Sequence, residues 1–312
     1  MTSEPVQGLL QQVYELLKTG ELEQANRELG GILQQNLENS DVIYALTGVN
    51  FWTDKLKKAM NATTAFERGE YLVSQWKPFT QYMEKQGPER EPLLYAIKHC
   101  AFSLALGFYQ TLYREDGTSR DPEIYRKTGL CYKELGDYER ALQLLEQAKD
   151  GDGDSPCILA ELADCYALCG ETRLSKVLFR EAFFLGAGKI ELHFLESEIV
   201  RRLVAQVHAL GYGGAELAEW IPVYGVLYSV LNVKRELRAL EFGKLKQSIF
   251  ALETELRDAP ADARAILVPR LINHYFWLID HYVNVNDDSA RINEVLLKIK
   301  LLDTDVYKRY TL

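Results

Sequence analysis

The chain has 312 residues, of which 47% are apolar, and this length accommodates one large helical array or two domains. Its formal net charge of −9 argues against general binding to nucleic acid or to anionic membranes, because both need a basic face. The first residues have no basic start and no apolar run, and the five cysteines are an odd number, so we expect no secretory signal, reduced thiols and a cytoplasmic location.

Degenerate helical pairs are predicted in the N-terminal part of the chain. Over 6–37, apolar and small residues recur at helical spacing on both sides of a turn at Gly20. A second pair is expected over 41–86, with an insertion near 53–68 that displaces its turn. A third pair is expected over 92–116, although its second helix is hard to place in the sequence.

Two adjacent stretches, 122–153 and 156–187, carry small and large residues at the same offsets, 34 positions apart. A fixed period of this length indicates stacked helical repeats. Folds of this kind usually provide surfaces that hold other molecules. The aligned pairs are Tyr125 and Leu159, Gly129 and Ala163, Tyr132 and Tyr166, Gly136 and Gly170, Ala141 and Ser175, Leu145 and Phe179, and Ala148 and Ala182.

Each stretch predicts two antiparallel helices joined by a tight turn. Gly129 and Ala141 are small where the paired helices must cross, since a large side chain there would hold the helices apart. Gly136 lies where the first helix must end, a position that favours a residue tolerating positive φ. Asp121 and Ser155 each precede a proline, which predicts a capped helix start in both stretches.

This pattern resembles the tetratricopeptide repeat (TPR) family, which places large, small, aromatic, glycine and alanine residues at these offsets. The clear resemblance covers 122–187, and Thr172 and Ser175 depart mildly from the pattern. It implies an all-α solenoid of antiparallel helix pairs over 1–187, followed by a C-terminal helical region over 188–312. The residues that fit are Tyr125, Gly129, Tyr132, Gly136, Tyr138, Ala141, Leu145 and Ala148, then Leu159, Ala163, Tyr166, Gly170, Phe179 and Ala182.

The resemblance also implies a concave surface that binds a protein or peptide. In TPR proteins, fixed positions of the first helix of each pair face this surface. Here they form a charged strip suited to a polar peptide in 122–153, a mixed set in 156–187, and a largely apolar set in the pair that begins at Asp41. The Lys and Asn of the family's carboxylate-clamp subclass are absent from the matching positions, so we do not expect binding of chaperone tails. The predicted groove residues are Arg126, Lys127, Leu130, Lys133, Glu161 and Asp164.

After residue 187 the repeat pattern stops but helical periodicity continues. Within this region, the segment from Trp220 to Val233 is the most apolar and is too short to span a bilayer comfortably, so we expect no membrane insertion. Ile221 to Leu231 is apolar nearly all round, which predicts burial on more than one side, against the repeats or within a small bundle. Helices are predicted at about 189–210, 215–232, 234–257, 262–284, 289–301 and 304–310.

Two groups of residues have spacings that could form a metal site or an acid–base site. Asp150, Asp152 and Asp154, with Glu161, repeat part of the ligand spacing of an EF-hand calcium loop, but Ser155 stands where that loop needs glycine. We therefore favour an acidic linker over a metal site. Among the histidines, His193 with Glu196 and His274 with His281 have spacings that fit one helix face, and we interpret these imidazoles as packing groups between helices.

The sequence contains no phosphate-binding loop, dinucleotide fingerprint or nucleophile elbow, and we expect neither catalysis nor a cofactor. The leading hypothesis is a non-catalytic TPR scaffold that binds a protein or peptide partner. An alternative is a transport-associated or carrier protein that binds a small apolar ligand between the repeats and the C-terminal helices. A third is a homo-oligomer closed through apolar faces. The ligand pocket of the second hypothesis would be lined by Trp52, Trp220, Tyr224, Tyr228 and Trp277.

Overall fold

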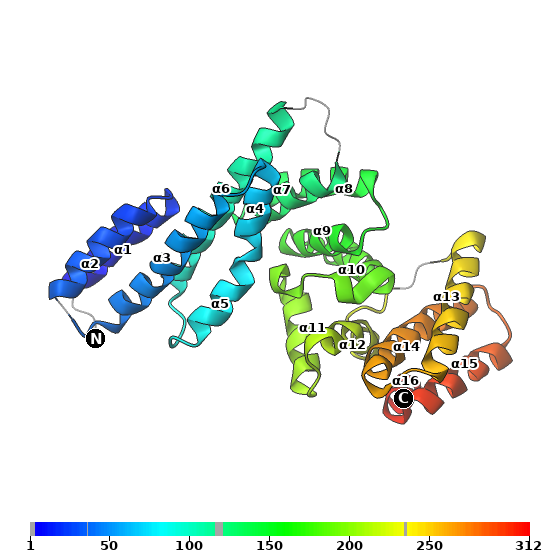
Figure 1. The fold of residues 1–312 in the computed structure, drawn as a ribbon. Helices are drawn as coiled ribbons and strands as arrows, with labels where there is room; N and C mark the ends of the chain where they lie inside the picture. Colours follow the sequence, from blue (N-terminus) through cyan, green and yellow to red (C-terminus); the bar gives the residue numbers. More distant parts are fainter. Residues whose placement is uncertain (1–3, 36, 116–120, 234–235) are drawn as a thin grey trace. The chain divides into compact units, whose positions relative to one another are not determined.

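The computed structural model describes residues 4–35, 37–115, 121–233 and 236–312, with side chains for 6–35, 37–112, 121–233 and 236–312. Within these residues the regular elements are α-helices and two short 3₁₀-helices (Figure 1), which confirms the predicted all-α class. The chain divides into two compact units, Met1–Gly151 and Asp152–Leu312. The predicted boundary at 187 lies inside the second unit, because the second repeat packs with the C-terminal helices.

In the first unit, the degenerate pairs differ from the prediction. The helix that begins at Ser40 runs on to Ala59, so the extra residues of the predicted insertion lengthen this helix and its turn. The segment expected to form a third pair is one continuous helix from Glu91 to Glu115. The helices of this unit are α1 (Glu4–Lys18), α2 (Leu22–Gln35), α3 (Ser40–Ala59), α4 (Ala65–Ser74), α5 (Trp76–Glu84), α6 (Glu91–Glu115), α7 (Pro122–Glu134) and α8 (Tyr138–Gly151).

In the second unit, the predicted C-terminal helices are confirmed from residue 198 onward with two differences. The helix predicted over 215–232 ends at Leu227, and the one predicted over 234–257 begins at Ala239, residues 234 and 235 lying outside the described ranges. The stretch before them, predicted as helix, instead holds the two 3₁₀-helices and an extended segment that ends at Ser197. The elements of this unit are α9 (Pro156–Leu168), α10 (Thr172–Gly186), η1 (Ala187–Lys189), η2 (Leu192–Phe194), α11 (Glu198–Ala209), α12 (Gly214–Leu227), α13 (Ala239–Arg257), α14 (Ala261–Asn284), α15 (Ser289–Leu302) and α16 (Thr304–Thr311).

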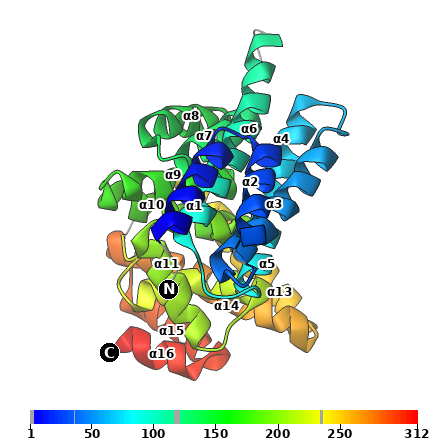
Figure 2. The same cartoon turned by 90° about the vertical axis from the view of Figure 1, so that its left-hand side faces the viewer.

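Three helical hairpins, α1–α2, α7–α8 and α9–α10, turn in the same way. Gly20, Gly136 and Gly170 have φ of 85°, 84° and 86°, a conformation that glycine adopts without strain. In each turn the glycine N–H bonds back three residues and the next N–H bonds back five, as in a Schellman motif. The predicted turns are therefore confirmed. Figure 2 shows α1 and α2 lying side by side.

Close packing of helices depends on the predicted small residues in α7–α8. A methyl group built on Gly129 would lie 2.8 Å from Leu145 Cγ and 3.3 Å from the Ala141 carbonyl oxygen. The two helices also meet at their outer ends, where a methyl group on Gly151 would lie 2.6 Å from Pro122 Cγ. The small residues thus set how near the paired helices approach.

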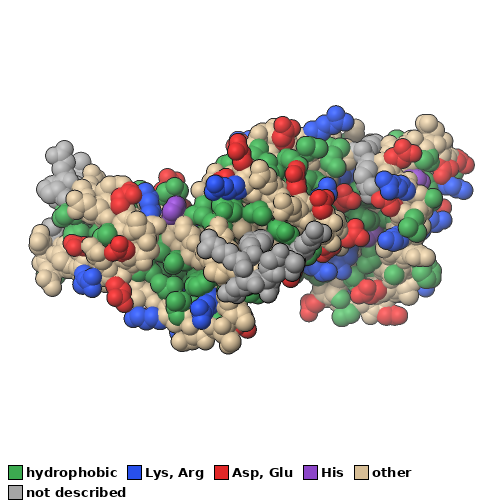
Figure 3. Space-filling model, turned by 90° about the horizontal axis from the view of Figure 1, so that it is seen from above, with side chains coloured by type: hydrophobic (Ala, Val, Ile, Leu, Met, Phe, Trp, Pro, Cys, Tyr) green, Lys and Arg blue, Asp and Glu red, His purple; other side chains and the backbone are tan. Residues whose placement is uncertain are grey.

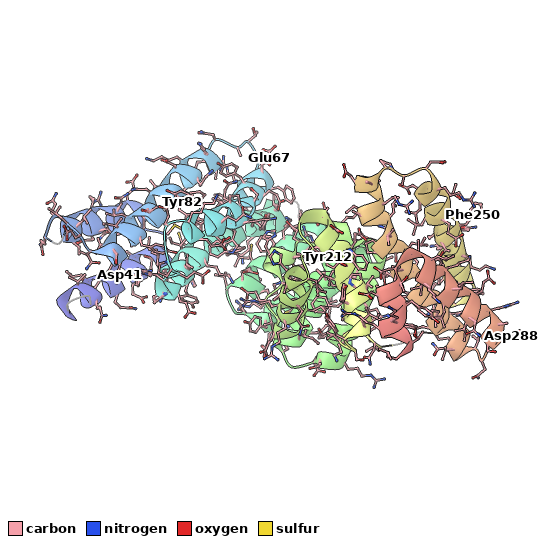
Figure 4. The ribbon with its side chains drawn as sticks, turned by 90° about the horizontal axis from the view of Figure 1, so that it is seen from below. Asp41, Glu67, Tyr82, Tyr212, Phe250 and Asp288 are labelled. Atoms are coloured by element: carbon pink, nitrogen blue, oxygen red, sulfur yellow. The ribbon has the colours of Figure 1, made fainter. Side chains whose placement is uncertain are left out.

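Helix starts and aromatic packing fix the other helices of the first unit. Thr64 and Glu67 form a complete capping box at the start of α4. Phe51 of α3 packs against Phe79 of α5, with ring centroids 5.3 Å apart, and Tyr82 stacks on Phe51 at 5.6 Å. Glu67 and Tyr82 are marked in Figure 4. These contacts pack α5 against α3, and Trp76 of α5 packs edge-on against Phe102 of α6.

Candidate functional site

The six predicted groove residues are all buried, with exposed fractions of at most 5%. They therefore do not form the open lining that the sequence predicts. Two of them lie in the second unit and four in the first, so each set is described within its own unit. The residues are Arg126, Lys127, Leu130 and Lys133 of α7, and Glu161 and Asp164 of α9.

In the first unit, charged residues of α7 hold neighbouring helices. The Lys127 ammonium lies 2.9 Å from a carboxylate oxygen of Glu70 in α4, and the hydroxyl of Tyr109 donates to the other oxygen of that carboxylate at 2.5 Å. Glu134 likewise pairs with Lys98 of α6 at 2.6 Å. The charged strip that resembled a peptide groove is therefore, in part, a set of buried ion pairs between helices of one unit.

In the second unit, Asp164 is covered by the chain's own next segment. Its two carboxylate oxygens accept hydrogen bonds from the backbone N–H groups of Glu196 and Ser197, both at 2.8 Å. The segment after the second hairpin thus lies on the α9 face that the sequence assigned to a partner. Hydrogen bonds from backbone N–H groups to an ionised carboxylate are stronger than hydrogen bonds between neutral groups. The two bonds to Asp164 therefore hold this segment firmly against α9.

The weaker site candidates receive no support. Among the described residues, no group of three His, Cys, Asp or Glu side chains is placed to hold a metal ion. Glu161, proposed as the last ligand of a calcium loop with Asp150, Asp152 and Asp154, is 2% exposed within α9. His193 lies in η2 and Glu196 in the extended segment after it, so they do not share a helix face as predicted.

The other histidine pair is used for packing, as we interpreted it from the sequence. His274 and His281 both lie in α14. The ring of His274 lies 4.8 Å from that of Phe184, and the ring of His281 stacks on Phe242 at 4.1 Å. His274 has a second role, because it lines a pocket.

We name this cavity of about 590 Å³ in the second unit the Lys189 pocket. It lies where the end of α10 and η1 approach α12, α13 and α14, helices that Figure 1 shows gathered in this unit. Its walls are largely apolar, and a few polar side chains converge on it, which is the usual composition of a ligand site. The lining residues are Phe183, Phe184, Leu185, Gly186, Ala187, Gly188, Lys189, Glu219, Ser248, Ala251, Leu252, Arg270 and His274.

One wall of the pocket carries a two-point ion pair. The Arg270 guanidinium donates to both oxygens of Glu219, at 3.2 and 2.5 Å. The Glu219 side chain is 4% exposed while Arg270 is 40% exposed, so the buried carboxylate is balanced by a cation that still reaches solvent. The pair joins α12 to α14 and contributes no net charge to the pocket.

His274 is neutral at pH 7 for reasons the geometry makes clear. Burial lowers the pKa of its imidazole to about 4. Its Nδ1 lies 2.8 Å from the Arg270 carbonyl oxygen, which only accepts, so Nδ1 carries the proton and donates. The histidine therefore adds no positive charge beside Arg270.

Lys189 is the remaining charged residue of the pocket. It is exposed, and no acidic side chain within the described ranges forms an ion pair with its ammonium. The Lys189 stem lies beside Gly186, since a methyl group built on this glycine would be in ordinary contact with Lys189 Cδ at 3.5 Å. Lys189 thus leaves one unbalanced positive charge at the pocket.

A second cavity, of about 630 Å³, lies beside η2 and α11 in the same unit. Its titratable lining includes His193, Arg201 and His208, all of them exposed. It has no buried charged residue among its lining, and we therefore regard the Lys189 pocket as the stronger candidate. On the face shown in Figure 3, basic and acidic side chains are interspersed among apolar ones.

None of the aromatic residues predicted to line a ligand pocket lines the Lys189 pocket. Trp220, Tyr224 and Tyr228 follow one another along one side of α12 and its end, with ring centroids 5.5 to 5.7 Å apart. Tyr212, marked in Figure 4, stacks on Trp220 at 4.8 Å. Trp52 belongs to the first unit. Trp277 comes nearest, because its ring lies 4.6 Å from Phe184, which lines the Lys189 pocket.

The charged residues of this pocket, which are Lys189, Glu219 and Arg270, were not predicted from the sequence. Neither Lys189 nor Arg270 belongs to a recognisable sequence pattern. A usable signal was the acid Glu219 directly before the apolar run of α12, since a carboxylate buried in such a helix needs a partner.

Comparison with protein-family models and with curated proteins found no match. Among the described residues, none of the helices combines the length and apolar character needed to cross a membrane. The site and the fold are therefore the observations that bear on function.

Proposed function

We propose that this chain is a non-catalytic TPR-type scaffold that binds a protein or peptide partner. The observation that carries the proposal is the hairpin turn repeated at Gly20, Gly136 and Gly170, with matching φ and hydrogen bonds. The 34-residue spacing between the last two turns supports the repeat assignment. Helical repeats give rigid, extended surfaces, which suits binding better than bond chemistry.

The binding test has to avoid the buried strip of α7. Replacing Arg126 and Lys133 by Glu places like charges in a packed interior, so lost binding would only report a damaged fold. We instead propose selection of a displayed random-peptide library on the immobilised full chain. The expected result is a shared peptide motif that binds saturably in fluorescence anisotropy and protects one set of helix faces from hydrogen exchange.

A matched sample controls this selection. The same protein held unfolded in urea during selection should enrich no motif. If the folded chain, verified by circular dichroism, also enriches no peptide over the input library, the scaffold proposal fails.

The Lys189 pocket favours a second candidate, a helical protein that binds a small, largely apolar ligand. Its volume of about 590 Å³ lies within the ordinary range of small-molecule sites. It is lined by residues of the second repeat hairpin and of the C-terminal helices, although none of the five aromatic residues predicted to line a ligand pocket is among them. Native mass spectrometry of protein purified without denaturant is expected to show a bound small molecule, and a spectrum of the bare chain alone would count against this candidate.

A further inference from the structure

The Lys189 pocket has a simple charge balance. Glu219 and Arg270 neutralise each other through two hydrogen bonds, and His274 is uncharged at pH 7. The other lining residues are neutral apart from Lys189, which has no acidic partner among the residues the structure describes. One positive charge is left, and it is the complement of one negative charge on a ligand.

The rest of the pocket is suited to an apolar group. Its lining includes Phe184 and Leu185 at the end of α10, and Ala251 and Leu252 of α13. Ser248 adds a hydroxyl at an exposed position of α13. A bound apolar body would remove these surfaces from water, which is the main source of affinity in such sites.

We propose that the Lys189 pocket binds a small monocarboxylic acid with an alkyl or aryl body. The carboxylate would pair with the Lys189 ammonium, and the body would lie against Phe184, Leu185 and Leu252. This inference rests on the second proposed function and names the chemistry of its ligand. The limited volume favours a small molecule over a length of extended peptide.

The binding test uses decanoate and decan-1-ol as a matched pair of probes. They share the alkyl chain, and decan-1-ol lacks the carboxylate. Isothermal titration calorimetry on the full chain at pH 7.5 should show saturable binding of decanoate and at least about tenfold weaker binding of decan-1-ol, because only the carboxylate can pair with Lys189.

Two variants assign the binding to this pocket. Lys189→Gln should weaken decanoate about tenfold and leave decan-1-ol unchanged, since it removes the charge and keeps most of the stem. Lys308→Gln is the matched control, because Lys308 is exposed on α16 in the same unit and does not line the pocket. Ser248→Trp should block both probes, and its exposed position lets the fold be verified by an unchanged melting temperature.

The inference would be overturned by equal binding of the two probes, by an unchanged decanoate affinity in Lys189→Gln, or by no binding of decanoate at all. Tighter binding of a short peptide with an apolar C-terminal residue and a free carboxylate than of decanoate would assign the pocket to peptide ends instead. A neutral molecule found by native mass spectrometry, with no decanoate binding, would leave the second proposed function standing while this inference fails.

Discussion

The hairpins α7–α8 and α9–α10 share a spacing and a turn, yet they bury charge in different ways. In α7, Lys127 is paired with Glu70, a side chain of another helix in the same unit. In α9, Asp164 accepts from the backbone of Glu196 and Ser197. An ion pair can often be replaced by apolar residues at little cost, whereas backbone donors cannot be removed. Charged residues on the first helices of the two hairpins therefore carry unequal energetic weight, although Lys127 and Asp164 stand at different positions of the repeat.

The largest effect is expected from Asp164→Ala. This change leaves two N–H groups at a buried segment without their acceptor, and each unsatisfied group costs about 1–3 kcal/mol. We expect the free energy of unfolding of the second unit to fall by about 3 kcal/mol or more. Urea denaturation followed by circular dichroism measures it.

Asp154→Ala is the control for this change. Asp154 is an exposed acid in the turn before α9, and its loss should shift stability by less than about 0.5 kcal/mol. If the two variants were equally stable, the segment 190–197 would not depend on Asp164. The hydrogen bonds of Asp164 to the backbone would then carry no more energetic weight than the ion pair of Lys127.

The next effect concerns pH and the neutral His274 of the second unit. Burial lowers its pKa from 6.5 to about 4, so the unfolded chain binds a proton more readily than the folded one. Its contribution is complete above pH 6.5 and is lost as the pH falls toward 4. Between pH 8 and pH 5 the loss from this group should be about 2 kcal/mol.

The variant His274→Phe isolates this group from the other titrating residues. It keeps a ring beside Phe184 but cannot bind a proton. Its free energy of unfolding should therefore fall less steeply with acid than that of the unmodified chain. Parallel curves for the two proteins would show that His274 is not held neutral by burial.

The sequence predicts the local features of the hairpins well and their covering poorly. Gly20 and Gly136 end helices because a residue at that position needs positive φ, and this requirement is visible in a single chain. Lys133 looked like part of an exposed strip because its helix face is charged. What lies over that face depends on residues distant in sequence, and Lys133 is fully buried.

The pocket shows the same limit. The bounds of α14 were predicted closely from periodicity, and those of α12 except for its last turn, but the ion pair of Glu219 with Arg270 joins residues 51 positions apart. No local pattern encodes that distance. The long helix α6 was also not predicted. The TPR resemblance led us to expect a helical pair over 92–116, where the chain forms one uninterrupted helix.

A smaller effect is expected where the helices cross. In Gly129→Ala, the new methyl group would lie 2.8 Å from Leu145 Cγ, and overpacking of this kind costs about 1–3 kcal/mol. Alanine's better helix propensity offsets about 1 kcal/mol of this. We expect a net loss of about 1 kcal/mol, measured by urea denaturation of the first unit.

Gly31→Ala is the matched control, because a methyl group built on Gly31 of α2 meets nothing within 4 Å. It should gain about 1 kcal/mol from propensity alone. In the second hairpin the crossing position already holds Ala163, which is fully buried. A gain in Gly129→Ala would mean that both hairpins have room for alanine, and the first would not pack more closely than the second.

The smallest effect distinguishes the two helix starts. Asp121 and Ser155 have nearly the same backbone conformation, with φ of −70° and −74°, but only Asp121 caps its helix, accepting from the Glu123 N–H at 2.9 Å. Asp121→Ala should therefore cost about 1 kcal/mol, while Ser155→Ala should change stability by less than about 0.5 kcal/mol. Because the backbone before α9 already has the shape of a cap, Ser155→Asp should gain about 0.5–1 kcal/mol. Thermal unfolding of the three variants measures these differences. If Ser155→Asp gained nothing, the backbone shape would not suffice for capping, and the two starts would differ by more than the length and charge of one side chain.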